Sequence, residues 1–265
     1  MRKAVLLAMA VIMMTRPAAA EDVILFAAGS LKAVLGDVAK AYTDDTGTGV
    51  TTQFGPSGLL RKRIEEGESA HVFASANMKH PGALAEAGKA GEVRMFARNK
   101  LCAIAQPEVS VSTDTLLNTM LDPAIRVGTS TPKADPSGDY AFALFGKAEA
   151  LKAGATATLE AKALKLTGGP DSPKPPEGRN NYGWVMSEKK ADIFLTYCTN
   201  ALLAQKDTPG LQTIQIPEAL SVGADYGLTV LNGAPEAGAK LADFILSDAG
   251  QKILGSYGFS TVGAQ

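Results

Sequence analysis

Histidine and cysteine are scarce in this chain, which has 265 residues and only two of each. The histidines, His71 and His80, lack the spacing of zinc ligands and do not belong to a strand-turn-helix nucleophile motif. The cysteines do not form a metal-ligand spacing either. The sequence therefore disfavours a metal centre and a histidine-dependent hydrolase, and it calls for no cofactor.

Runs of basic residues are also lacking. The chain has 26 Lys and Arg against 27 Asp and Glu, and its formal net charge is −1. A protein that binds nucleic acid needs a basic patch, so we expect no nucleic-acid partner. If the ligand is a small anion, the overall field does not attract it, and local dipoles must hold it.

A long hydrophobic segment is missing too. The apolar run near the N-terminus covers residues 4–14, which is too short for a membrane anchor. It follows Arg2 and Lys3 and precedes the alanines at 18–20, a pattern typical of a signal peptide over residues 1–20. No cysteine follows Ala20 to carry a lipid. The sequence thus predicts cleavage after Ala20 and a periplasmic protein, expected to be a monomer.

The two cysteines, Cys102 and Cys198, each stand at the end of an apolar run. In an oxidising compartment they are candidates for a disulfide. The alternative is a pair of buried thiols that behave as small apolar residues. The sequence leaves both possibilities open.

Short apolar strands alternate with helical patterns along the mature chain of about 245 residues, which predicts an α/β protein with mostly parallel sheet. The strands are expected at Val23–Ala27, Val50–Phe54, His71–Ser75, Leu101–Ala105, Arg126–Gly128, Ile193–Tyr197, Leu211–Ile216 and Tyr226–Leu231. The helices are expected at Leu31–Asp44, Gly58–Glu66, Gly82–Glu86, Thr113–Leu121, Gly138–Ala150, Thr156–Ala163, Tyr182–Lys189, Ala237–Leu246 and Ala249–Tyr257. The proline-rich segment 168–178 reads as a surface loop.

Three serines mark the starts of helices. Ser30 and Ser57 each follow an apolar strand, and Ser137 lies in the unit Asp-Pro-Ser-Gly-Asp-Tyr before a helical stretch. A strand that hands over to a helix leaves free backbone N–H groups and a hydroxyl at the positive end of the helix dipole, which suits an anion. Each serine alone could simply cap its helix. Together, the three predict helix starts that converge on one anionic ligand.

Several segments resemble the periplasmic molybdate-binding proteins of ABC transporters, a group within the periplasmic oxyanion-binding proteins. The resemblance covers nearly the whole mature chain. It is carried by Phe26–Leu31, Gly55–Gly58, Leu60–Gly67, Val72–Asn77, Asp135–Ala141, Ala191–Tyr197 and Gln251–Phe259. Their order and spacing together carry the resemblance.

The resemblance implies a two-lobed periplasmic binding protein fold of type II, each lobe a mostly parallel sheet flanked by helices. The chain crosses outward near Ala103–Gln106 and returns near Ser221–Asp225. Lobe 1 would comprise residues 21–104 and 223–265, and lobe 2 residues 105–222. The ligand would lie in the cleft and draw the lobes together.

The resemblance also implies an oxyanion site without a counter-charge. Ser30 and Ser57 match two serines that offer a hydroxyl and an N–H, Ser137 matches a backbone N–H, and Tyr197 matches a tyrosine hydroxyl. The remaining contact in the family is an uncharged residue that offers a backbone amide, and an ungapped count places Arg179 there. An arginine in the cleft would suit a carboxylate, phosphonate or sulfonate at least as well as molybdate.

Three functions follow from these patterns. The leading one is a binding protein that delivers molybdate or tungstate to the membrane permease and ATPase of an ABC transporter. The second keeps the fold but binds a small organic anion, a phosphonate or a sulfonate through Arg179. The third, from a different class, is an exported serine hydrolase, which lacks a suitably placed histidine base.

Overall fold

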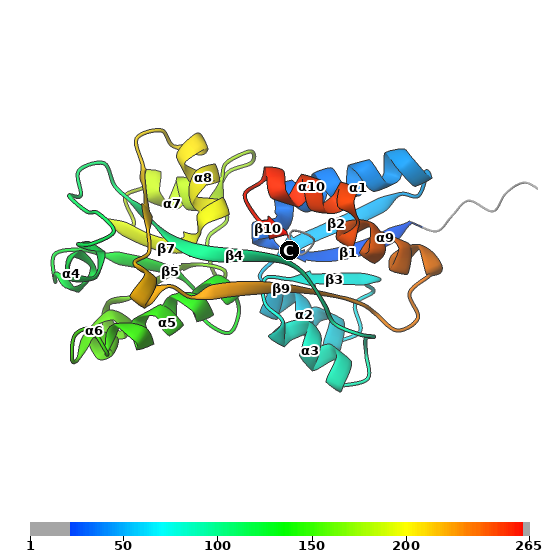
Figure 1. Ribbon diagram of the computed structural model, residues 1–265, viewed down its shortest axis with the longest axis horizontal. Helices are drawn as coiled ribbons and strands as arrows, with labels where there is room; N and C mark the ends of the chain where they lie inside the picture. Colours follow the sequence, from blue (N-terminus) through cyan, green and yellow to red (C-terminus); the bar gives the residue numbers. More distant parts are fainter. Residues whose placement is uncertain (1–21, 262–265) are drawn as a thin grey trace, which may run out of the picture.

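The structure, a computed structural model, describes residues 22–261. The expected signal peptide, residues 1–20, lies outside the described residues. Figure 1 shows two groups of strands and helices, joined by two long strands that run between them. Within residues 22–261, no helix combines the length and the apolar character needed to cross a membrane.

The described residues alternate between strands and helices, as the sequence predicts. The strands are β1 Val23–Ala28, β2 Val50–Gly55, β3 Val72–Ser75, β4 Arg94–Ala105, β5 Val127–Ser130, β6 Leu164–Thr167, β7 Ile193–Tyr197, β8 Gln212–Gln215, β9 Gly223–Val230 and β10 Ser260–Thr261. The helices are α1 Lys32–Thr46, α2 Ser57–Glu65, α3 Lys79–Glu86, α4 Leu116–Leu121, α5 Pro136–Ala148, α6 Ala155–Lys162, α7 Asn181–Ser187, α8 Cys198–Asp207, α9 Glu236–Leu246 and α10 Asp248–Ser256. Two short 3-10 turns cover Gly29–Leu31 and Glu218–Leu220.

The sheet is mixed, with the strand order β2-β1-β3-β9-β4-β7-β5-β6. Parallel pairs join β1 to β2 and β3, and join β5 to β6 and β7. The strands in the middle are antiparallel, because β9 pairs with β3 and β4, and β4 also pairs with β7, β8 and β10. The α/β class is thus confirmed, with parallel strands in the outer parts of the sheet.

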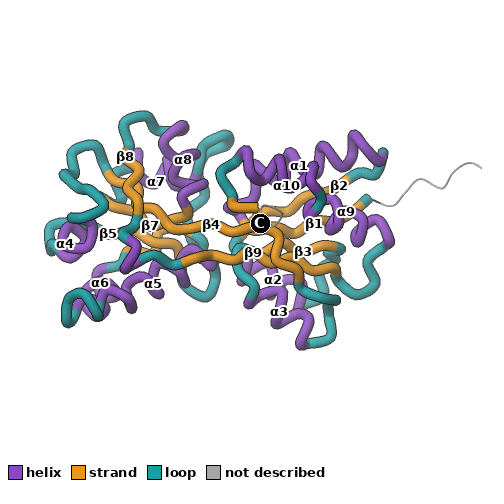
Figure 2. Tube along the Cα trace, viewed as in Figure 1, coloured by secondary structure: helices purple, strands orange, loops and turns teal. Residues whose placement is uncertain are grey.

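Strand β4 belongs to both groups. Residues 94–100 pair with β9, whereas residues 101–105 pair with β7 and β8. Figure 2 shows β4 and β9 as the strands that run from one group to the other. We call the group with β1, β2, β3, β10, α1–α3, α9 and α10 lobe 1, and the group with β5–β8 and α4–α8 lobe 2.

Helices cover both faces of the sheet, so inner strands such as β3 and β7 are buried on both sides. All four residues of β3 and all five of β7 are buried. Helix α1 buries Val34, Leu35 and Val38 at helical spacing, which packs one face of the helix on the sheet. In both lobes, buried strands and packed helices therefore hold the residues at the strand ends in place.

Three elements, α8, β6 and the two-residue strand β10, lie where the sequence pattern predicts none. Helix α8 follows β7 directly, and its buried face consists of Thr199, Asn200, Ala201 and Ala204. Small and polar residues on the buried face give no apolar periodicity, which is why the helix was not expected. Strand β6 is only four residues long and follows α6 at once, so its alternation is too short to distinguish from the end of a helix.

A disulfide joins Cys102 on β4 to Cys198 at the start of α8, with Cα atoms 4.8 Å apart. The bridge connects positions 96 residues apart in the sequence. Both cysteines pack among the apolar residues of lobe 2, and Cys102 is fully buried. The bridge therefore ties the linking strand β4 to the residue that follows Tyr197.

Replacing both cysteines by alanine is expected to lower the free energy of unfolding by about 2–5 kcal/mol, because the bridge closes a long loop in the unfolded chain. Urea unfolding of the parent and the double variant under oxidising conditions measures the difference. The parent treated with reductant serves as the control and should match the variant. Equal unfolding midpoints of the oxidised parent and the variant would contradict this role of the bridge.

Candidate functional site

The two serines of lobe 1 lie beyond the carboxyl ends of neighbouring parallel strands. Ala28 at the end of β1 pairs with Gly55 at the end of β2, and each serine comes two residues later. Ser30 falls in the 3-10 turn before α1, and Ser57 is the first residue of α2. Because parallel strands end at the same edge of a sheet, Ser30 and Ser57 share one end of lobe 1.

Hydroxyl contacts connect Ser30 to the linking strand β9. The Ser30 Oγ lies 3.1 Å from the hydroxyl of Tyr226, which is fully buried. The side chain of Asn99 on β4 donates to the Tyr226 hydroxyl at 3.5 Å and to Thr199 Oγ1 at 2.8 Å. A residue of lobe 1, the two linking strands and α8 of lobe 2 therefore meet in one polar group.

Ser57 and Tyr197 meet at the loop after β3. The Ser57 Oγ is buried and accepts the N–H of Ala76 at 3.2 Å. The Tyr197 hydroxyl, at the end of β7, donates to the carbonyl of the same Ala76 at 3.4 Å. The ring of Tyr197 lies 5.5 Å from that of Tyr226. Ser30, Ser57 and Tyr197 are thus connected through two intermediate residues.

The burial of Tyr197 determines its protonation. Removal from water raises the pKa of its hydroxyl well above the ordinary value, and the neighbouring Tyr226 and Asp135 raise it further. Burial likewise raises the pKa of Tyr226. Both hydroxyls therefore stay neutral near pH 7 and can donate hydrogen bonds.

The lobes touch through backbone beside Ser57. The N–H of Gly58 in α2 donates to the carbonyl of Ala134 in lobe 2 at 2.9 Å. A Cβ on Gly58 would lie only 2.3 Å from the carbonyl oxygen of Lys133. Lys133 itself has a φ of 68°, a left-handed backbone conformation that residues other than glycine seldom adopt. This close approach requires glycine at position 58.

Ser137 presents its hydroxyl rather than its amide. Its backbone N–H, which the resemblance assigns to the ligand, donates at 3.0 Å to Oδ1 of Asp135, the N-cap of α5. Its side chain is fully buried, and Oγ has no hydrogen-bond partner among residues 22–261. A buried hydroxyl without a partner costs free energy unless a ligand satisfies it.

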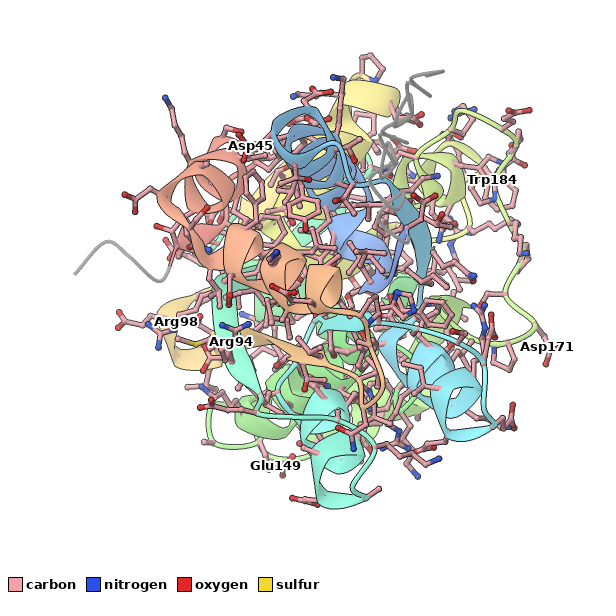
Figure 3. All side chains as sticks on the ribbon, turned by 90° about the vertical axis from the view of Figure 1, so that its right-hand side faces the viewer. Asp45, Arg94, Arg98, Glu149, Asp171 and Trp184 are labelled. Atoms are coloured by element: carbon pink, nitrogen blue, oxygen red, sulfur yellow. A yellow bond between two sulfur atoms is a disulfide. The ribbon has the colours of Figure 1, made fainter. Side chains whose placement is uncertain are left out.

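Arg179 does not join this group. Its guanidinium binds Asp207 at the end of α8, at 3.1 Å, and also reaches Ser187 and Thr208. Figure 3 places Asp171 and Trp184 along one edge of the molecule, which is the side of the proline-rich loop before Arg179. The Nζ of Lys190 covers the ring of Trp184 at 4.6 Å. The charge of Arg179 is thus paired within lobe 2. The ion pair joins the segment before α7 to the end of α8.

Several polar residues near the serines were not predicted as site residues. Tyr226 and Asn99 stand beside other polar residues of their strands, Asp225 and Arg98 respectively, so no motif marks them. Asn181, two residues after Arg179, has a buried Oδ1 without a partner in the described chain. Asp135 begins the unit Asp-Pro-Ser-Gly-Asp-Tyr, but the sequence gives no sign that its pKa is unusual. Removal from water raises the pKa of its carboxyl to about 6.

The histidines lie elsewhere. The Nδ1 of His71 accepts the backbone N–H of Ile24 at 3.1 Å. His80 is buried in α3, and burial together with Arg61 and Lys79 lowers its pKa to about 4. In the described part of the chain, no hydrogen bond joins a histidine to the three serines, and no cluster of acidic, histidine and cysteine residues could hold a metal ion. The arrangement brings together neutral hydroxyl groups, with the Asp135 carboxyl beside Ser137.

Two comparisons of sequence relate this chain to known proteins. An uncharacterized protein of Pasteurella multocida (strain Pm70) is 37% identical over 237 residues, which cover 89% of this chain and 97% of the relative. The molybdate-binding protein ModA of Escherichia coli (strain K12) is 26% identical over 244 residues, or 89% of this chain and 88% of that protein.

The fold is also found among solved structures. The periplasmic molybdate-binding protein of Azotobacter vinelandii superposes with a TM-score of 0.71 at 18% identity, over 90% of this chain and 98% of that one. The model of the family described as bacterial extracellular solute-binding protein matches residues 23–260, nearly all of the described chain. This chain therefore belongs to the family of bacterial extracellular solute-binding proteins.

Proposed function

We propose that this protein binds a tetrahedral oxyanion, molybdate or tungstate first of all, in the periplasm and delivers it to the permease and ATPase of an ABC transporter. The ligand lies between lobe 1, residues 21–104 and 223–265, and lobe 2, residues 105–222. Ser30, Ser57, Ser137 and Tyr197 supply the hydrogen bonds.

The Ser137 hydroxyl carries this proposal. It is fully buried without a partner in the described chain, and it lies at the start of α5, three residues after Ala134, whose carbonyl accepts the N–H of Gly58 beside Ser57. Buried polar atoms in native proteins are nearly always satisfied, so an unpaired hydroxyl this close along the chain to the contact between the lobes suggests a ligand. The similarity to ModA of Escherichia coli supports an oxyanion as that ligand.

Neutral donors explain how such a site would select its anion. Hydroxyl and N–H groups fixed in a dry site stabilise a full charge, because the local dielectric is low. Size then decides among anions of the same shape. Molybdate and tungstate are nearly equal in size and should bind alike, whereas the smaller sulfate and phosphate should bind more weakly.

The alternative ligand, an organic acid, phosphonate or sulfonate held by Arg179, finds less support. Arg179 already has Asp207 as its ionic partner, and the Asp207 side chain is only 12% exposed. To reach a ligand, the guanidinium would leave a largely buried carboxylate unpaired, which is costly. The exported hydrolase finds less support still, because His71 accepts the backbone N–H of Ile24 and, among residues 22–261, no hydrogen bond joins the buried ring of His80 to a serine.

Ser30→Ala and Ser57→Ala are each expected to weaken molybdate binding by about 1–3 kcal/mol, the range for a lost hydrogen bond to a charged group. Isothermal calorimetry with molybdate, tungstate and sulfate measures the effect. Ser69→Ala, a change at an exposed serine of lobe 1, is the matched control and should bind like the parent. If both site variants also bind like the parent, the proposed pocket is wrong.

Gly58→Ala is expected to weaken the same binding by about 5- to 150-fold, corresponding to about 1–3 kcal/mol of overpacking, because the new methyl group would push Lys133 away and hold the lobes apart. Gly36→Ala in α1 is the control, since a Cβ there meets nothing within 4 Å. Calorimetry compares the two. Unchanged affinity in the Gly58 variant would mean that the lobes need not approach this closely for binding.

Arg179→Ala is expected to lower the free energy of unfolding by about 1 kcal/mol, since Asp207 loses its ionic partner, and to leave molybdate affinity within about twofold. Lys174→Ala in the same loop, an exposed cation without an ion pair in the described chain, is the control. Urea unfolding and calorimetry give both quantities. Loss of anion binding in the Arg179 variant would favour the organic-anion alternative.

A further inference from the structure

The amides at the start of α5 are already occupied. Pro136 has no N–H, and the N–H of Ser137 donates to Oδ1 of Asp135. The N–H groups of Gly138 and Asp139 both donate to the backbone carbonyl of Asp135. A ligand that approaches this helix start therefore meets the Ser137 hydroxyl and, beside it, the Asp135 carboxyl.

Among residues 22–261, no cation lies close enough to Asp135 to balance its charge. Besides the Ser137 N–H, the Ser130 hydroxyl is the group that favours its ionised form, whereas Asp139 on the same helix opposes it. The groups that face it from other elements are the hydroxyls of Tyr182 on α7, Tyr197 on β7 and Tyr226 on β9, whose pKa values its charge raises. Lys133, two residues earlier, is exposed, and the guanidinium of Arg179 is bound to Asp207.

The packing around Asp135 keeps it in place. A Cβ on Gly168, at the end of β6, would lie 2.5 Å from both the Cβ and Oδ2 of Asp135, and glycine there has a φ of 74°. The carboxyl is thus enclosed by β6 on one side and capped onto α5 on the other. It has little room to turn away when an anion enters.

Two negative charges side by side in a site of low dielectric are strongly unfavourable, and one proton between them removes most of that cost. A carboxyl that is already hard to ionise in the empty site is the group on which this proton resides most easily. The same proton could equally be described as a hydroxyl of the ligand that donates to an ionised Asp135. In both descriptions the complex of protein and anion holds one shared proton, so a measurement of proton uptake gives the same result.

We propose that Asp135 and the bound oxyanion share one proton, so that the protein takes up a proton when it binds an anion near neutral pH. This inference rests on the proposed oxyanion site between Ser30, Ser57, Ser137 and Tyr197. Asp135 is then a specificity-determining residue, since the proton compensates for an acceptor in a site otherwise made of donors. The site can also accept a singly protonated anion, which a site made only of donors would reject.

The pH dependence follows from the starting state of Asp135. Burial raises the pKa of its carboxyl to about 6, and a neighbouring anion raises that value further. Below about pH 6 the free protein already carries the proton, so affinity should be nearly constant. Above that, affinity for a fully ionised anion should fall by up to about tenfold per pH unit.

Calorimetry with molybdate tests the proposal, because molybdate is a fully ionised dianion near neutral pH and brings no proton of its own. Titrations near pH 7 in buffers of different ionisation enthalpy report the number of protons taken up. The parent should take up close to one proton per bound anion. Asp135→Asn, which keeps the N-cap, should take up close to none and lose the pH dependence of affinity.

Asp139→Asn is the matched control, because it removes the other carboxyl in the first turn of α5 and should keep the proton uptake. Asp135→Ser is a second capping variant if the asparagine variant does not fold, as judged by its melting curve. Binding by the parent without proton uptake, or uptake that persists in the Asp135 variants, overturns the inference and leaves the oxyanion site standing. Absence of binding to molybdate, tungstate and sulfate alike overturns the proposed function itself.

Discussion

The two lobes meet through peptide backbone, and the candidate site exists only while they do. The N–H of Gly58 and the carbonyl of Ala134 lie 2.9 Å apart, and no side chain fits between them. This contact brings the first residue of α2 next to the turn that leads into α5, so that Ser57 and Ser137 belong to one region. Without it, each serine would be a helix-start residue on a separate sheet, with solvent as its natural partner.

The candidate site offers neutral hydroxyl groups rather than an opposite charge. Hydroxyls from Ser30, Ser57, Ser137, Tyr197 and Tyr226 come from five elements, and the cations nearest in the sequence are turned to other partners or to solvent. The fold holds these hydroxyls in place, and Tyr197 has to release the carbonyl of Ala76 before its hydroxyl can donate to an anion. How well these hydroxyls bind an anion also depends on the charge of nearby groups, so the protonation state of Asp135 matters.

The sequence predicted those parts of the fold that have strong local patterns. The apolar strands β1 and β7 and the helices α1 and α9 lie within two residues of their expected bounds, because buried strands and amphipathic helices leave clear periodicities. Helix α8 and the partners of Ser30 could not be predicted in this way. Burial of small and polar residues leaves no pattern, and the contacts of Tyr226 and Asn99 join positions more than one hundred residues apart.

Arg179 shows the limit of counting along a sequence. The ungapped alignment put its charge in the cleft, but the proline-rich loop before it gives the chain another path, and Asp207 offers it a carboxylate in the same lobe. The ion pair depends on a residue in a helix that the pattern did not show. A charge can be assigned to a site only when its competing partners are known.

The bridge between Cys102 and Cys198 has a mechanical consequence. It fastens the strand that spans both lobes to the residue just after Tyr197, so this tyrosine cannot slide along β4 when the lobes separate. Any bending must then occur on the lobe 1 side of the bridge, where β4 pairs with β9 and not with β7. Tyr197 would move with lobe 2 as part of one rigid body, and release of a ligand would begin with loss of the contacts at Ala76 and Gly58.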